Sequence, residues 1–113
     1  MAIDKEKAEV KRLTEIYKEL PPKQFAIAQG LIAEAARLRV RLDALWADIA
    51  ENGETEQFRQ GENQTPYERE RPASRIYTAT NKNYQTIIRQ LNDMIPEEPK
   101  VVTDSKLGGF MSE

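Results

Sequence analysis

The residues from Lys23 to Ala50 constrain the fold more than any other part of the chain, because their apolar side chains recur with the period of a packed helix. We call the recurring set the first seam; it consists of Ala28, Leu31, Ala35, Leu38, Leu42, Leu45 and Ile49. The spacings alternate between three and four, as the a and d positions of a heptad repeat do. The stretch therefore predicts a long helix over residues 23–50, closed by Asn52 and Gly53, that packs against another helix.

A second helix of matching length is predicted over residues 72–95. Pro72 suits its first turn and Pro96 prevents its continuation. Its apolar positions form a second seam, again with alternating spacings of four and three: Ala73, Tyr77, Thr80, Tyr84, Ile87, Leu91 and Met94. Because the two seams have equal length, we expect them to pair as a long antiparallel, coiled-coil-like helical hairpin that forms the core.

A third helix is predicted near the N-terminus, over about residues 4–20, with Asp4 as its N-cap. Its narrow apolar face consists of Val10, Leu13, Tyr17 and Leu20. Pro21 and Pro22 end this helix and make a bent joint, at which it can fold back on helix 23–50. The predicted class is all-α, with one helical domain over residues 1–95.

Helix 23–50 carries more apolar surface than one partner covers, because Phe25, Ile32 and Trp46 widen its apolar arc beyond the first seam. This arc can pack against the N-terminal helix or against a neighbouring subunit. We name Phe25, Ile32 and Trp46 as the candidate oligomer interface of a homo-oligomer. For Trp46, burial against a neighbouring helix is favoured over stacking on a ligand.

Residues 54–71, ETEQFRQGENQTPYERER, have no helical period and hold five acidic and three basic residues. Such a long polar connection is functional, partly structured or mobile. One possibility is a small β-hairpin that pairs Glu56–Gln60 with Gln64–Glu68 and is anchored by Phe58 and Tyr67.

The C-terminal residues 96–113, PEEPKVVTDSKLGGFMSE, are polar, contain two prolines and lack any period, so we expect a flexible tail. A small apolar cluster within it is a candidate docking motif for a partner, with plain disorder as the alternative: Leu107, Phe110 and Met111.

The residue types present argue against an enzyme. The chain contains neither cysteine nor histidine. A nucleophile–base pair would therefore need unusual lysine chemistry, and a zinc site would have to be built from carboxylates alone, which is uncommon. Carboxylates are plentiful, but none is expected on an apolar helix face, where a perturbed pKa would be found. We expect no cofactor, no metal and no small-molecule substrate. No apolar run approaches the roughly 20 residues of a membrane helix, and the N-terminus lacks an apolar signal core, so the expected location is cytoplasmic.

Three basic residues of helix 72–95 are spaced by seven and therefore form one line along its surface: Arg75, Lys82 and Arg89. We call them the basic stripe. A line of cations suits the phosphate backbone of double-stranded DNA, which needs positioned charge and no base chemistry. The alternatives are a solvated face, or a face that pairs with acidic residues of a neighbouring subunit.

The run ERPASRIYTATNKNYQTIIRQLNDMIPEE, together with the polar loop and long helix before it, resembles small terminase subunits of tailed phages and prophages of Gram-positive bacteria. The resemblance covers about residues 28–98, with these matching points: Gly53, Gly61, Pro72, Lys82, Asn83, Tyr84, Leu91 and Pro96. It implies a non-catalytic protein of the host cell cytoplasm that assembles into a ring, recognises phage DNA and recruits the large terminase subunit.

The chain departs from that family at its N-terminus. Many small terminase subunits begin with a helix-turn-helix DNA-binding domain, whereas helix 4–20 ends at Pro21 and Pro22 rather than at a tight turn. DNA contact would then come from helix 72–95, helix 4–20 or the loop. The alternative function is a helical structural or regulatory interaction module of a phage or prophage that binds no nucleic acid.

Overall fold

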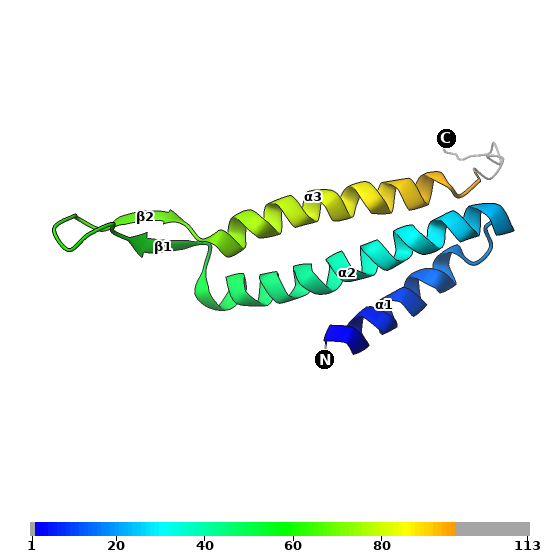
Figure 1. The fold of residues 1–113 in the computed structure, drawn as a ribbon, viewed down its shortest axis with the longest axis horizontal. Helices are drawn as coiled ribbons and strands as arrows, with labels where there is room; N and C mark the ends of the chain where they lie inside the picture. Colours follow the sequence, from blue (N-terminus) through cyan, green and yellow to red (C-terminus); the bar gives the residue numbers. More distant parts are fainter. Residues whose placement is uncertain (1, 97–113) are drawn as a thin grey trace, which may run out of the picture.

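The computed structural model describes residues 2–96, which form three helices and a two-stranded antiparallel sheet. In chain order these are α1 (Ala2–Tyr17), α2 (Pro22–Asn52), β1 (Thr55–Phe58), β2 (Tyr67–Glu70) and α3 (Pro72–Asp93). Figure 1 shows α2 and α3 side by side and antiparallel, with α1 against α2 and the sheet projecting beyond the far end of the helical pair. The predicted mostly helical architecture is confirmed.

Proline and glycine set the helix ends largely as the sequence predicts. Pro22 and Pro72 each occupy the first turn of a helix. Gly53 adopts a φ of 86°, which favours glycine, and its N–H donates to the Ile49 carbonyl at 2.7 Å to close α2. The predicted N-cap role of Asp4 is wrong: α1 already includes Ala2, so Asp4 lies in the first turn, where its charge still suits the helix dipole.

The core follows the two predicted seams. Every residue of both seams is buried or half-buried. In α2 the buried members alternate with half-buried ones, which are Leu31, Leu38 and Leu45. The antiparallel pairing of α2 and α3 therefore buries the faces that the heptad spacing marks.

α1 covers one side of this helical pair at the end away from the sheet. Its Leu13 and Tyr17 are buried, as is Leu20 in the turn that follows. They join one apolar cluster with Ile32 of α2 and Leu91 of α3. The Tyr17 hydroxyl donates a hydrogen bond to Asn92 Oδ1 at 2.7 Å, which ties α1 to the last turn of α3.

The sheet confirms the predicted β-hairpin with a shift in its second strand. Phe58 lies opposite Tyr67 and Thr55 lies opposite Glu70. The first strand ends at Phe58, two residues earlier than expected, and the second begins at Tyr67, three residues later, so the turn is longer at both ends. Pro66 immediately precedes this strand, and since proline has no N–H to donate, a start after it is the favourable one. The Phe58 and Tyr67 rings meet edge to face, with centroids 5.9 Å apart.

Candidate interaction surfaces

The basic stripe lies on the solvent side of α3. Arg75, Lys82 and Arg89 are all exposed, and their spacing of seven places them about 10 Å apart along one line of the helix. Within residues 2–96, none of the three makes an ion pair. The stripe is therefore a row of cations that an external anion can reach.

Other arginines and one lysine of the described residues are already paired with carboxylates. The pairs are Arg12–Glu9, Lys18–Glu15, Arg37–Glu34, Arg39–Asp43, Arg69–Glu56 and Arg71–Asp48. Three of them are one helical turn apart within α1 or α2, where such pairs contribute a few tenths of a kcal/mol each, and Lys18–Glu15 spans the end of α1. The cations of the basic stripe lack such partners within their own helix, because α3 contains only one acidic residue, Asp93.

The candidate oligomer interface on α2 is only partly available. Ile32 is 1% exposed and lies in the core, and Phe25 is half-buried against the same cluster. The sequence left two possible partners for this arc, the N-terminal helix or a neighbouring subunit. At Phe25 and Ile32 the partner is the N-terminal helix, α1. Trp46 is different: it is 54% exposed, so the expected burial is wrong. Its ring lies 5.7 Å from that of Tyr77, tilted by 47°.

The oblique path of α1 explains why Trp46 stays exposed. Phe25, Ile32, Arg39 and Trp46 are spaced by seven along one line of α2. At its C-terminal end α1 covers the start of this line, but Ala2 at its N-terminal end borders Val40, Ala44 and Ala47, which lie on a different line. Figure 1 shows α1 moving away from α3 toward its N-terminus. The last position of the line is left uncovered.

A carboxylate on the buried side of α1 was missed by the sequence analysis. The side chain of Glu9 is only 14% exposed, and it accepts hydrogen bonds from Arg12 Nε and Nη2 at 2.9 and 2.6 Å. These bonds hold the pKa of Glu9 below its ordinary value despite partial burial. The sequence gives one indication of this burial: Glu9 precedes the core residue Leu13 by four positions, so the two lie on the same side of α1. The carboxylate is thus neutralised by Arg12, which suits a structural ion pair rather than a catalytic acid.

Arg71 connects the base of the sheet to the end of α2. Its Nη1 donates to the Gly53 carbonyl at 2.7 Å, its Nη2 donates to Asp48 Oδ1 at 3.0 Å, and its backbone N–H donates to the Glu54 carbonyl at 2.8 Å. Hydrogen bonds from Asn52 and then Arg71 lower the pKa of Asp48. This cluster sets the direction in which the sheet leaves the helical pair.

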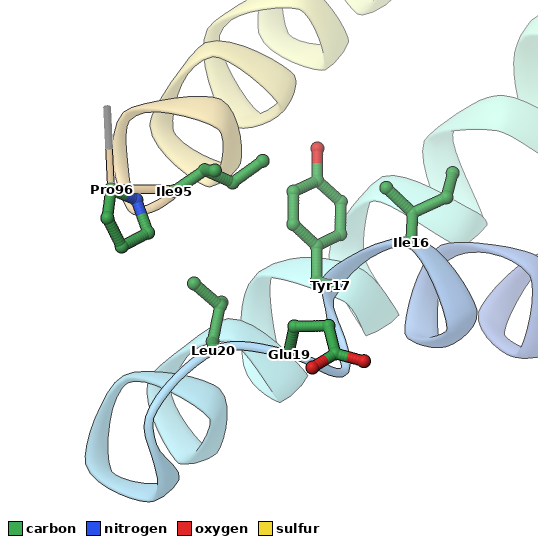
Figure 2. A pocket seen from close by; sticks show the side chains of 6 residues that line it. All are labelled: Ile16, Tyr17, Glu19, Leu20, Ile95 and Pro96. Atoms are coloured by element: carbon green, nitrogen blue, oxygen red, sulfur yellow. The ribbon is translucent and has the colours of Figure 1, made fainter. Parts of the chain in front are cut away.

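A small apolar pocket lies at the opposite end of the molecule (Figure 2). Ile16, Tyr17 and Leu20 line it from the α1 side, and Ile95 and Pro96 line it from the end of α3. Its volume of about 80 Å³ is far below the roughly 300 Å³ at which ligand pockets begin. It suits a single side chain. The candidate docking residues Leu107, Phe110 and Met111 lie outside the described residues.

The candidate sites described above are the basic stripe, the apolar arc of α2 and the small pocket. Over residues 2–96, no three carboxylates gather as the ligands of a metal ion would. No helix in the same range is long and apolar enough to cross a membrane. Comparisons with protein-family models, with curated proteins and with solved structures find no match.

Proposed function

We propose that this chain is a non-catalytic DNA-packaging component resembling the small terminase subunits of tailed phages. In this role the basic stripe contacts the backbone of double-stranded DNA, the coiled-coil-like α2–α3 pair supports a homo-oligomer, and the oligomer recruits a large terminase subunit. The observation that carries the proposal is the exposure of Arg75, Lys82 and Arg89 without ion pairs among residues 2–96. The resemblance in residues 28–98 supplies the biological context.

The strength of the contact follows from the number of cations. A single copy that neutralises three phosphates should show a slope of about −2.7 for log K against log salt, so its affinity falls roughly 40-fold between 50 and 200 mM salt. Three contacts give weak binding. Several copies on one DNA raise the apparent affinity, because each later contact is made at a high effective concentration.

The decisive experiment is charge reversal of the stripe. A variant with Arg75→Glu, Lys82→Glu and Arg89→Glu should lose measurable gel-shift binding to linear double-stranded DNA in 50 mM salt. The matched control reverses the three exposed lysines of α1, Lys5, Lys7 and Lys11, and so makes the same change in net charge. The control should retain most of the binding. Equal binding by wild type and the stripe variant would show that DNA does not contact this face of α3.

The second candidate function is a helical interaction module that binds no nucleic acid. The net charge of −2 and the exposed apolar side chains on all three helices favour it. It predicts no gel shift for wild type at any salt concentration, while association with a protein partner persists. Anisotropy of labelled DNA titrated with wild-type protein therefore separates the two functions.

A further inference from the structure

An apolar strip runs along the α2–α3 pair on the side away from Leu13 and Tyr17 of α1. The N-terminal end of α1 borders it at one point, where Ala2 and Glu6 line a surface hollow together with Leu38. On α2 it consists of Ile27, Leu31, Leu38 and Leu45; on α3 it consists of Ile76 and Ile87. Ile27 is 63% exposed and Ile76 is 38% exposed, and the other four are half-buried. We call these six residues the open strip. When a third helix covers only one side of a helical pair, the apolar side chains on the other side remain partly in solvent.

Helical geometry places the open strip on a different side of α2 from Phe25 and Ile32. Leu31, Leu38 and Leu45 are spaced by seven, and Ile27 precedes Leu31 by four, so all four share one line of α2. At 100° per residue this line lies more than a quarter turn from the Phe25–Ile32 line, on which α1 packs. The α2–α3 layer therefore has two apolar sides. The chain itself fills one of them with a helix, through Leu13 and Tyr17 of α1.

The polar residues beside the strip suit contact with an identical surface. Ile76, Asn83 and Gln90 are spaced by seven and form the α3 edge of the strip, and both amides are exposed. An amide both donates and accepts hydrogen bonds, so it can pair with its own copy, which a charged side chain cannot do without repulsion. The cations of α3 lie on the next line of the helix, outside this edge. The α2 edge carries one charge of each sign, because Glu34 and Arg41 each lie one turn from the leucines of the strip. A two-fold axis that reverses α2 sets Glu34 of one copy toward Arg41 of the other, so both edges suit a second copy better than a partner of one net charge.

The size of the strip is sufficient for such a contact. From Ile27 to Leu45 it spans about 27 Å along the helix axis, and two helices packed side by side are about 20 Å wide. Two copies would bury on the order of 1,000 Å² in total, which reaches the lower limit of specific interfaces. Ile27 and Ile76 mark opposite ends of the strip, so a two-fold axis through its centre brings apolar ends together.

We propose that two copies of the chain associate through their open strips, around a two-fold axis, into a layer of four helices with one α1 on each outer side. The inference deepens the proposed function, because it names the surface through which the chain assembles and replaces Phe25 and Ile32 in that role. The dimer itself does not require the proposed function; only its biological purpose rests on that function. In this dimer the two basic stripes remain outside the contact.

Ile27→Glu tests the inference with little risk to the fold, because the side chain is already mostly exposed. Wild type should show an even multiple of the chain mass by light scattering, and Ile27→Glu should raise the dissociation constant at least roughly 100-fold, because two unpaired carboxylates enter one interface. The control is Ile3→Glu in α1, whose side chain is also 63% exposed. The control should keep the wild-type mass. A monomeric wild type, or an Ile27→Glu variant of unchanged mass, would overturn the inference.

Disulfide trapping tests the two-fold axis directly, since the chain has no native cysteine. Asn83 lies near the centre of the strip, so Asn83→Cys should form a covalent dimer under mild oxidation. Lys82→Cys, one position further around α3, should not. Equal trapping of the two variants would contradict the assignment. If either test of the open strip fails while wild type still binds DNA, only the dimer interface is refuted. Loss of DNA binding in the charge-reversal variant of the basic stripe concerns the proposed DNA contact and not the dimer interface.

Discussion

The guanidinium of Arg71 lies 3.0 Å from Oδ1 of Asp48, and this contact joins the last residue before α3 to the final turns of α2. The same guanidinium also donates to the Gly53 carbonyl. Gly53 can present that carbonyl because its φ of 86° turns the chain sharply at the end of the helix. One side chain thus fixes both ends of the segment that carries the sheet.

Arg71→Ala should loosen the sheet without unfolding the helices. The change removes two side-chain hydrogen bonds, one of them to a carboxylate, and should cost roughly 1–2 kcal/mol of stability. Amide hydrogen exchange should show that Phe58 loses protection while Tyr84 keeps it. Arg59→Ala, which removes only a long bond to the Glu62 carbonyl, should change neither. Parallel loss of protection at both amides in Arg71→Ala would mean that the sheet and helices unfold as one unit.

Glu9→Gln should reduce stability at neutral pH and have a smaller effect in acid. The pKa of Glu9 is lowered in the folded chain, so the folded state binds fewer protons than the unfolded state near that pKa. The stabilisation is therefore present above the ordinary carboxyl pKa and is lost as the pH falls through the lowered value. Urea unfolding at pH 7 should show a loss of about 1 kcal/mol, with little difference between wild type and variant near pH 2.

The matched variant for this effect is Glu15→Gln. Glu15 also pairs with a cation one turn away, Lys18, but both side chains are mostly exposed. An exposed pair of this kind contributes little, so Glu15→Gln should leave the free energy of unfolding at pH 7 almost unchanged. If both variants behave alike, the partial burial of Glu9 has no energetic consequence.

Tyr17→Phe should weaken the attachment of α1. It deletes the hydrogen bond to Asn92 and should lower the free energy of unfolding by roughly 0.5–1.5 kcal/mol. Proteolysis within α1 should become faster than cleavage in α3. Tyr67→Phe removes a hydroxyl from an exposed ring and serves as the control. Unchanged proteolysis of Tyr17→Phe would show that apolar packing alone holds α1 in place.

Leu42→Ala and Trp46→Ala should differ sharply although the two residues are one turn apart. Leu42 is fully buried in the first seam, and its truncation should cost about 2–5 kcal/mol through lost burial and a cavity. Trp46 rests on Tyr77 with half its surface in solvent, so its truncation should cost about 1 kcal/mol. Thermal unfolding followed by circular dichroism measures both. A larger loss for Trp46→Ala would place the main core of this region at the aromatic pair.

Much of the fold follows from local sequence signals. The spacing of both seams predicts which faces of α2 and α3 are buried, and Pro22, Gly53 and Pro72 mark helix ends within about two residues. Phe58 and Tyr67 are named from the sequence as anchors of a possible hairpin, and the structure brings their rings together across one. These signals are reliable because each depends on dihedral preferences or on periodicity within a single element.

The spacing alone likewise predicts the basic stripe. Its lack of carboxylate partners among residues 2–96 is, in contrast, a property of the folded chain. The role of Arg71 was not predictable in the same way. Arg71 bonds to groups 18 and 23 positions away. Such contacts depend on how elements are placed relative to one another, which no local pattern records.

The sequence by itself determined which helix faces are apolar, where the helices break and that the chemistry of histidine and cysteine is absent. Only the tertiary structure decided how the apolar arc of α2 is shared. Phe25, Ile32 and Trp46 are equivalent by spacing, yet α1 covers the first two and leaves the third exposed. The physical reason is the oblique crossing of α1 over α2. A helical period specifies the direction of a side chain around its own axis, whereas the crossing of two helices depends on the packing of both surfaces together.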